Sequence, residues 1–137
     1  MMTMTIWLRI SAVISLLFTI GHTMGGLKRW SPMGDNPVLQ AMSSVRFEVM
    51  SVSRTYLDFF MAFGWLLSVT MLMQSVLLWQ LASIASTDPA SVRPLIAVFA
   101  VATIASAVIA WRMIFPIPAV FAAVLAASLV IAFIAAR

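Results

Sequence analysis

The sequence predicts an all-α integral membrane protein, a four-helix bundle with an amphipathic interfacial helix between spans one and two. Three observations support this fold class. Of the 137 residues, 64% are hydrophobic and only 9% are charged, and the mean hydropathy is +1.10, far from soluble domains. The apolar residues form four runs of about 20 residues, the length of a helix that crosses a bilayer. The connections are short, so we expect a single transmembrane domain over residues 1–137.

The first span is predicted at residues 5–24. It ends before Gly25 and Gly26, which are typical of a helix C-terminus. The first six residues carry no charge and no clear cleavage site follows the apolar run, so we expect this segment to remain a span rather than be removed as a signal peptide. Arg9 lies close to Trp7, and we expect it to anchor the helix at the membrane interface.

A polar connection rich in Gly and Pro covers residues 25–40, and its Lys28 and Arg29 are expected to contact lipid headgroups. Asn36 before Pro37 predicts a helix start, because Asn caps free backbone N–H groups and proline lacks one. Apolar residues then recur at helical spacing, at Val38, Leu39, Met42, Val45, Val49 and Val52. This pattern predicts an amphipathic helix over residues 37–53 that lies on the membrane or against the bundle.

The second span is predicted at residues 56–83, longer than a bilayer requires, so we expect it to tilt or protrude. Gly64 beside Trp65 marks a bend or a point of close helix packing. Asp88 before Pro89 repeats the capping pattern and predicts a helix start after a short loop.

The third and fourth spans are predicted at residues 94–115 and 118–136, joined by a tight turn at Pro116 and Pro118. Small residues recur at every fourth position, at Ala102, Ser106 and Ala110 in one span and Ala119, Ala123 and Ala127 in the other. Helices in lipid associate through close backbone approach, so these ridges predict a tight antiparallel hairpin. The same spans offer a surface for a homo-oligomer or a membrane partner.

Four spans with short connections place both termini on one side of the membrane. An aromatic belt would then put Trp7 and Trp79 at one level and Trp30 and Trp111 at the other. One end of the bundle collects most polar residues, namely His22, Lys28, Arg29, Arg46, Glu48, Arg54, Tyr56, Asp58 and Arg112. The other end has only Arg9, Asp88, Arg93 and Arg137. The larger number of basic residues favours the first end as the cytoplasmic one.

The polar end is the candidate site, because charges near hydrocarbon need partners. Arg46, Met50, Arg54 and Asp58 follow one another at intervals of four and would form one stripe on a helix. We expect Asp58 to be held ionised by Arg54 or Arg112. The cluster is interpreted either as a ligand pocket or as an ion-pair latch that pins the amphipathic helix. The predicted ligand-binding residues are Arg46, Glu48, Arg54, Tyr56, Asp58, Trp65 and Arg112.

His22 and Asp58 are the candidates for a catalytic role, since histidine titrates near physiological pH and both side chains can transfer protons. Other chemistry is excluded by composition. The sequence has no cysteine and one histidine, which argues against disulfides, thiolate catalysis and a metal site. No cofactor motif is present, and the basic residues form no stripe of the kind that binds nucleic acid.

Two strings, GHTMGGLKRWSPMG and VRFEVMSVSRTYLDFFMAFGW, resemble a family of small, uncharacterised bacterial membrane proteins with four predicted spans. The resemblance covers nearly the whole chain and implies a multi-pass protein of the bacterial inner membrane, without implying a chemistry. In shape and length the chain is also remotely similar to DoxX-type proteins, with no diagnostic motif. It departs from sterol isomerases, whose apolar helical cavities hold acidic residues, because its only glutamate is Glu48, so none of their catalytic residues is carried over.

These observations leave three functions open. The leading expectation is a small inner-membrane protein that binds an amphipathic or lipid-like small molecule at the polar cluster, without a cofactor. The first alternative is a membrane enzyme that carries out proton-transfer chemistry on a lipophilic substrate. The second is a structural or accessory subunit that docks a larger membrane partner, or a second copy, through spans three and four.

Overall fold

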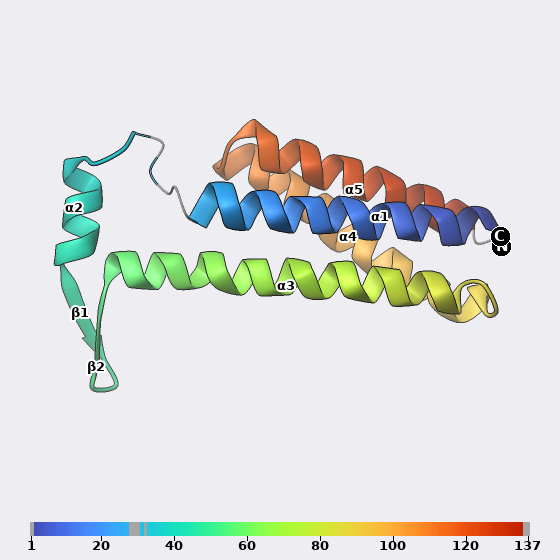
Figure 1. The fold of residues 1–137 in the computed structure, drawn as a ribbon, viewed down its shortest axis with the longest axis horizontal. Helices are drawn as coiled ribbons and strands as arrows, with labels where there is room; N and C mark the ends of the chain where they lie inside the picture. Colours follow the sequence, from blue (N-terminus) through green and yellow to red (C-terminus); the bar gives the residue numbers. More distant parts are fainter. Residues whose placement is uncertain (1, 28–30, 32, 136–137) are drawn as a thin grey trace. The chain divides into compact units, whose positions relative to one another are not determined.

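A computed structural model describes the whole chain except residues 1, 28–30, 32 and 136–137. Its elements, in order, are helix α1 (Met2–Gly21), π-helix η1 (His22–Leu27), helix α2 (Pro37–Ser44), strands β1 (Arg46–Val49) and β2 (Val52–Thr55), and helices α3 (Tyr56–Ile84), α4 (Pro89–Met113) and α5 (Pro116–Ile134) (Figure 1). The predictions made for Lys28, Arg29, Trp30 and Arg137 lie outside the described residues.

The prediction of four spans is confirmed. Four helices are long and apolar enough to cross a membrane, namely Met2–Leu27, Tyr56–Ile84, Pro89–Met113 and Pro116–Ile134. Many of their large apolar side chains are exposed, such as Leu66, Val98 and Val120, as expected where lipid rather than water is the solvent. The chain is therefore a multi-pass membrane protein.

The chain divides into two compact units. The first unit combines Met1–Phe18 with Met71–Arg137, and the second unit is Thr19–Thr70. The first unit contains the start of α1, the second half of α3 and all of α4 and α5. The second unit contains the end of α1, the π-helix, α2, the β-hairpin and the start of α3.

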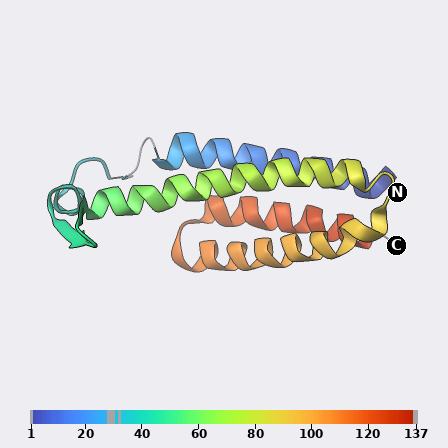
Figure 2. The ribbon, with the colours of Figure 1, turned by 90° about the horizontal axis from the view of Figure 1, so that it is seen from below.

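The first unit is a bundle with one apolar core. Helices α4 and α5 lie side by side as an antiparallel hairpin (Figure 2), as the sequence predicts. Segments of α1 and α3 complete the core, whose most deeply buried large side chains are Met4, Leu8, Leu78, Ile96 and Leu129. Asp88 caps the start of α4 by accepting a hydrogen bond from the Ser91 backbone N–H at 3.2 Å, which confirms its predicted role.

The small-residue ridges predicted for this hairpin are wrong in detail. Ala110 and Ala119 are buried, but the other members are exposed, namely Ala102, Ser106, Ala123 and Ala127. The buried positions instead follow steps of three, four or seven, at Ile96, Ala100, Thr103 and Ala110 in α4 and at Ala119, Ala122, Ala126 and Leu129 in α5. A helix has 3.6 residues per turn, so a strict spacing of four drifts off the contact face, whereas alternating steps stay on it.

Buried serines join the helices of the first unit. The hydroxyl groups of Ser11 in α1 and Ser128 in α5 lie 2.7 Å apart. Ser75 in α3 donates a hydrogen bond to the Ala12 carbonyl oxygen at 2.8 Å, and Ser15 donates to the Met71 carbonyl oxygen at 3.3 Å. Such bonds between helices are typical of membrane bundles, where an unpaired hydroxyl has no water to bind.

In the second unit the start of α2 is capped as the sequence predicts. The Asn36 side-chain oxygen accepts hydrogen bonds from the backbone N–H groups of Val38 at 3.0 Å and Leu39 at 3.1 Å. Pro37 occupies the first helical position. A backbone N–H at this position has no partner within the helix, so proline loses no hydrogen bond there.

The amphipathic helix predicted over residues 37–53 is wrong after Ser44. The chain instead forms an antiparallel hairpin in which the paired residues are Arg46 with Thr55, Phe47 with Arg54, Glu48 with Ser53 and Val49 with Val52. The run RFEV alternates polar and apolar residues, which suits a strand, and the serine hydroxyls at the end of α2 bond to the Gln40 carbonyl oxygen and so compete with continued helix.

A tight two-residue turn closes this hairpin. Met50 and Ser51 have φ values of 52° and 64°, as a type I′ turn requires. Such turns usually contain Asn or Gly, because other residues are strained at positive φ. The absence of both is the reason that the turn was not evident from the sequence.

Candidate functional site

The hairpin and the first turn of α3 carry most of the predicted ligand-binding residues. Arg46 and Glu48 belong to β1, Arg54 belongs to β2, and Tyr56 and Asp58 begin α3. Figure 1 shows the hairpin leaving the start of α3 at a steep angle to the helix axis. All of these residues lie within the second unit.

The two arginines of the hairpin converge on one backbone oxygen. Arg46 Nε donates to Ser53 Oγ at 2.9 Å and its Nη2 to the Ser53 carbonyl oxygen at 3.2 Å. Arg54 Nη1 donates to the same carbonyl oxygen at 2.9 Å. Two like charges are thus held beside each other on an exposed surface, where a negatively charged ligand would relieve their repulsion.

Asp58 has a different role from the one that the sequence suggested. Its Oδ2 accepts a hydrogen bond from the Thr55 backbone N–H at 3.0 Å, and Thr55 Oγ1 accepts one from the Asp58 backbone N–H at 3.0 Å. This reciprocal pair is a capping box at the start of α3. The sequence carried its signal, a threonine followed three residues later by an acid before an apolar run.

The predicted stripe of Arg46, Met50, Arg54 and Asp58 is therefore wrong, because it required one continuous helix. Arg54 bonds to the Ser53 carbonyl oxygen and Asp58 to Thr55. No ion pair joins Arg54 to Asp58, both of which are described residues. The interpretation of the cluster as an ion-pair latch therefore loses the pair of Arg54 and Asp58 on which it depended.

An aromatic row extends from the hairpin along α3. The Phe47 ring lies 5.1 Å from the Tyr56 ring and 5.6 Å from the Phe59 ring, and the Phe59 ring lies 4.9 Å from the Phe63 ring. Sequence reasoning missed the three phenylalanines as site residues. The signal was the spacing of residues 56, 59 and 63, which places them on one side of a helix.

The remaining predicted site residues lie apart from this row or belong to the other unit. Glu48 is exposed and paired with Ser53 in the hairpin register. Trp65 follows Phe63 by two positions, which turns it away from the aromatic row on a helix. Arg112 is exposed in the last turn of α4 and belongs to the first unit.

His22 lies in a separate polar cluster of the second unit. Its Nδ1 lies 3.0 Å from Ser68 Oγ, which lies 2.8 Å from Thr23 Oγ1. Thr23 Oγ1 also donates to the Thr19 carbonyl oxygen at 2.8 Å. Ser68 follows Asp58 in α3 by ten residues, about 15 Å along the axis. The structure thus brings His22 to Ser68 rather than to Asp58, and the proposed proton-transfer pair gains no support.

Gly64 is a point of close packing, as the sequence predicts. A methyl group at this position would overlap the side chain of Leu27, the last residue of the π-helix. The missing side chain therefore lets buried Leu27 contact the surface of α3 directly.

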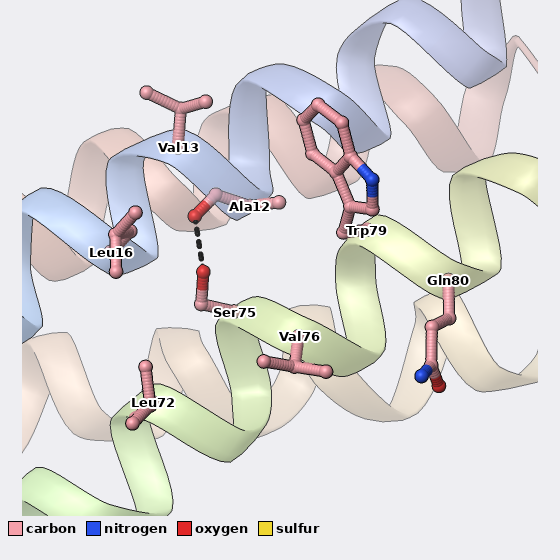
Figure 3. Close-up of a pocket in the computed structure, with 8 residues that line it drawn as sticks. All are labelled: Ala12, Val13, Leu16, Leu72, Ser75, Val76, Trp79 and Gln80. Atoms are coloured by element: carbon pink, nitrogen blue, oxygen red, sulfur yellow. Dashed lines mark hydrogen bonds between the residues drawn. The ribbon is translucent and has the colours of Figure 1, made fainter.

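Two surface grooves lie in the first unit. One has a volume of about 320 Å³ and is lined by Ala12, Val13, Leu16, Leu72, Ser75, Val76, Trp79 and Gln80 (Figure 3). The other has a volume of about 430 Å³ and is lined by Met2, Thr5, Ile6, Arg9 and Ser86. Neither groove includes a predicted ligand-binding residue, so neither is the cavity expected near Asp58.

No protein-family model, curated protein or solved structure matches this chain. The comparisons therefore assign no family, and the resemblance to small bacterial four-span proteins stays a prediction. The spans and the bundle rest on the helices themselves.

Proposed function

We propose that this multi-pass protein resides in a bacterial inner membrane and binds a lipid-like small molecule with an anionic head. The binding site that we propose, called the hairpin site below, consists of Arg46, Arg54, Phe47, Tyr56, Phe59 and Phe63. The observation that carries the proposal is the convergence of two guanidinium groups on the Ser53 carbonyl oxygen.

The arginines suit an anionic head. Guanidinium groups bind phosphate and carboxylate through paired N–H donors. The hydrogen bonds to Ser53 occupy some of these donors and hold both groups in place before a ligand arrives. Binding to groups already held in position costs less side-chain entropy.

The aromatic row suits an apolar tail. Tyr56, Phe59 and Phe63 are exposed and succeed one another along the first turns of a membrane-spanning helix. A molecule whose head binds the arginines would lay its chain along these rings. Aromatic side chains are common at this level of a bilayer because they combine apolar area with tolerance of the interface.

The acidic residues set the selectivity. Exposed Glu48 lies on the same strand as Arg46 and lowers the attraction for an anion. We expect Glu48→Gln to strengthen binding of an anionic amphiphile and Arg54→Gln to weaken it. Asp58 is engaged in the capping box, so Asp58→Asn, which keeps the acceptor oxygen, should change the bound lipids less than either arginine substitution.

The test is mass spectrometry of the molecules that co-purify with the protein. The double variant Arg46→Gln, Arg54→Gln should lose an anionic amphiphile that the wild type retains. Arg112→Gln is the matched control, because it removes one exposed arginine from the first unit and leaves the hairpin unchanged. Retention of the same molecules in undiminished amounts by the double variant would contradict the proposal.

A second candidate function is that of a structural or accessory subunit. It is supported by the small residues that face outward from α4 and α5, namely Ala102, Ser106, Ala123 and Ala127. Such residues permit close approach of another membrane helix. The substitution Ala123→Leu should break such an assembly while leaving a monomer folded. Cross-linking in the native membrane, compared between this variant and the wild type, tests the assembly.

A further inference from the structure

The two grooves of the first unit meet at one pair of side chains. The Arg9 guanidinium carbon lies 4.9 Å from the centre of the Trp79 ring. Trp79 lines the groove between α1 and α3, and Arg9 lines the second groove. An apolar groove is therefore bordered by a positive charge.

The first groove has an apolar floor. The one interaction drawn in Figure 3 is the hydrogen bond from Ser75 Oγ to the Ala12 carbonyl oxygen, which satisfies both polar atoms at the floor. Leu16 and Leu72 flank this bond on the side away from Trp79. The volume of about 320 Å³ is at the lower end of the range for small-molecule sites. A flexible hydrocarbon chain suits such a groove, since the other residues that line it are apolar except Gln80 and the indole N–H of Trp79.

The second groove suits a head group. Arg9 is exposed and stacks on an aromatic face, an arrangement that leaves its N–H donors at the ring edge for a phosphate. Ser86 contributes a hydroxyl group that donates to the Ser83 carbonyl oxygen at 2.6 Å, so its oxygen can still accept a hydrogen bond from a hydroxyl group of a lipid head. No described Asp or Glu lines either groove, which favours an anion there.

The level of Arg9 in the membrane agrees with this assignment. Trp79 lies near the end of α3, and tryptophan is enriched where a helix passes the lipid head groups. Arg9 reaches the Trp79 ring from the first half of α1. A phosphate at Arg9 would therefore lie at the depth at which lipid phosphates occur.

We propose that the groove between α1 and α3 of the first unit binds an anionic phospholipid. Its phosphate contacts Arg9, and one acyl chain occupies the groove beside Trp79. Lipid chains cover every exposed apolar face of a membrane helix. The groove between α1 and α3 differs from such a face because an arginine that lies over an aromatic ring borders it.

The experiment measures lipid binding to the full chain by native mass spectrometry, with phosphatidylglycerol and phosphatidylcholine of identical chains as the two probes. We expect the wild type to prefer the anionic lipid and Arg9→Gln to lose about fivefold of that preference, the effect of one basic residue at a membrane surface. Arg112→Gln is the matched control and should keep the wild-type preference. An unchanged preference in Arg9→Gln, or an equal loss in Arg112→Gln, overturns the proposal.

Two further variants separate the chain from the head group. Val76→Trp fills the groove from its exposed rim and should weaken both lipids alike. Arg9→Lys keeps the charge without the guanidinium group over the Trp79 ring and should keep only part of the preference. This variant provides the comparison if Arg9→Gln does not fold. If Val76→Trp bound each lipid as tightly as the wild type does, that result would contradict an acyl chain in the groove. The comparison of Arg9→Gln with its parent is repeated in the Arg46→Gln, Arg54→Gln background, in which the hairpin site lacks both arginines. A loss of preference that persists in that background is independent of the hairpin site, and one that disappears there overturns the proposal.

Discussion

The bundle of the first unit and the hairpin of the second unit use their polar side chains in opposite ways. In the first unit, buried serines bind partners on other helices, as Ser11 does with Ser128 and Ser75 with the Ala12 carbonyl oxygen. In the second unit, Arg46 and Arg54 bind the backbone of their own hairpin and remain exposed. The serine hydrogen bonds hold the helices of the bundle together. The exposed arginines leave positive charge at a surface where an anionic ligand can bind.

The contrast extends to the length of chain that each contact spans. The serine hydrogen bonds of the first unit join helices far apart in sequence, whereas the contacts of the hairpin site lie within residues 46–63. We therefore expect substitutions at buried contacts of either unit to act on stability, whereas substitutions of exposed arginines act on binding. Four substitutions at buried or capping positions measure the effect on stability.

The largest effect is expected from the core of the first unit. Leu129 is completely buried, and Leu129→Ala should lower the free energy of unfolding by about 3 kcal/mol, because it removes packed atoms and leaves a cavity. The measurement is equilibrium unfolding in mixed detergent micelles. The control Val120→Ala, at a position 55% exposed, should change stability by less than about 0.5 kcal/mol. Equal effects would contradict the assigned core.

A smaller effect is expected at Gly64 in the second unit. The added methyl group of Gly64→Ala overlaps Leu27, so the variant should lose about 2 kcal/mol through overpacking. Leu27→Ala in the same chain should restore part of that loss. Gly25→Ala is the control, since nothing lies within 4 Å of its added methyl group. Unfolding monitored by helix content measures all three, and a loss in Gly25→Ala as large as in Gly64→Ala would argue against the contact.

The capping box gives the third prediction. Thr55→Ala removes the hydroxyl group that accepts from the Asp58 backbone N–H and should cost about 1 kcal/mol, whereas Thr55→Ser keeps it. Hydrogen exchange at the first turn of α3 measures the local effect. If Asp58 bound the ligand instead of capping the helix, Thr55→Ala would leave that exchange unchanged.

The smallest effect is expected from the serine pair. Ser128→Ala removes the hydrogen bond between α1 and α5 and should cost about 0.6 kcal/mol, the average for such bonds in membrane proteins. Ser106→Ala is the control, because the exposed Ser106 hydroxyl donates only to the Ala102 carbonyl oxygen of its own helix. The same unfolding assay compares the two variants, and a larger loss in the control would refute the role given to the pair.

Much of the first unit could be predicted because its determinants are regular. Long apolar runs specify spans, Asp88 before Pro89 specifies a helix start, and the short connection before Pro116 specifies a hairpin. The face of that hairpin could not be predicted from a spacing of four. The lipid exerts no hydrophobic force between helices, so apolar side chains on the two faces of α4 look alike in sequence.

The second unit could be predicted less well because its elements are short. Residues 46–55 contain apolar side chains at both helical and alternating spacing, so the pattern alone could not decide between helix and strand. The choice depends on tertiary contacts that have no local signal, such as that of Phe47 with Tyr56 and Phe59. The arginines were found as site residues, but their meeting point at Ser53 required the hairpin.

The hydroxyl pair of Ser11 and Ser128 also constrains how the protein is made. The two residues are 117 positions apart, so the first helix leaves the ribosome long before its partner exists. During that interval Ser11 can bind the Trp7 carbonyl oxygen of its own helix, a bond that it also makes in the finished protein at 2.8 Å. Insertion of the first helix is thereby separated from assembly, which can finish only once the last helix has been synthesised.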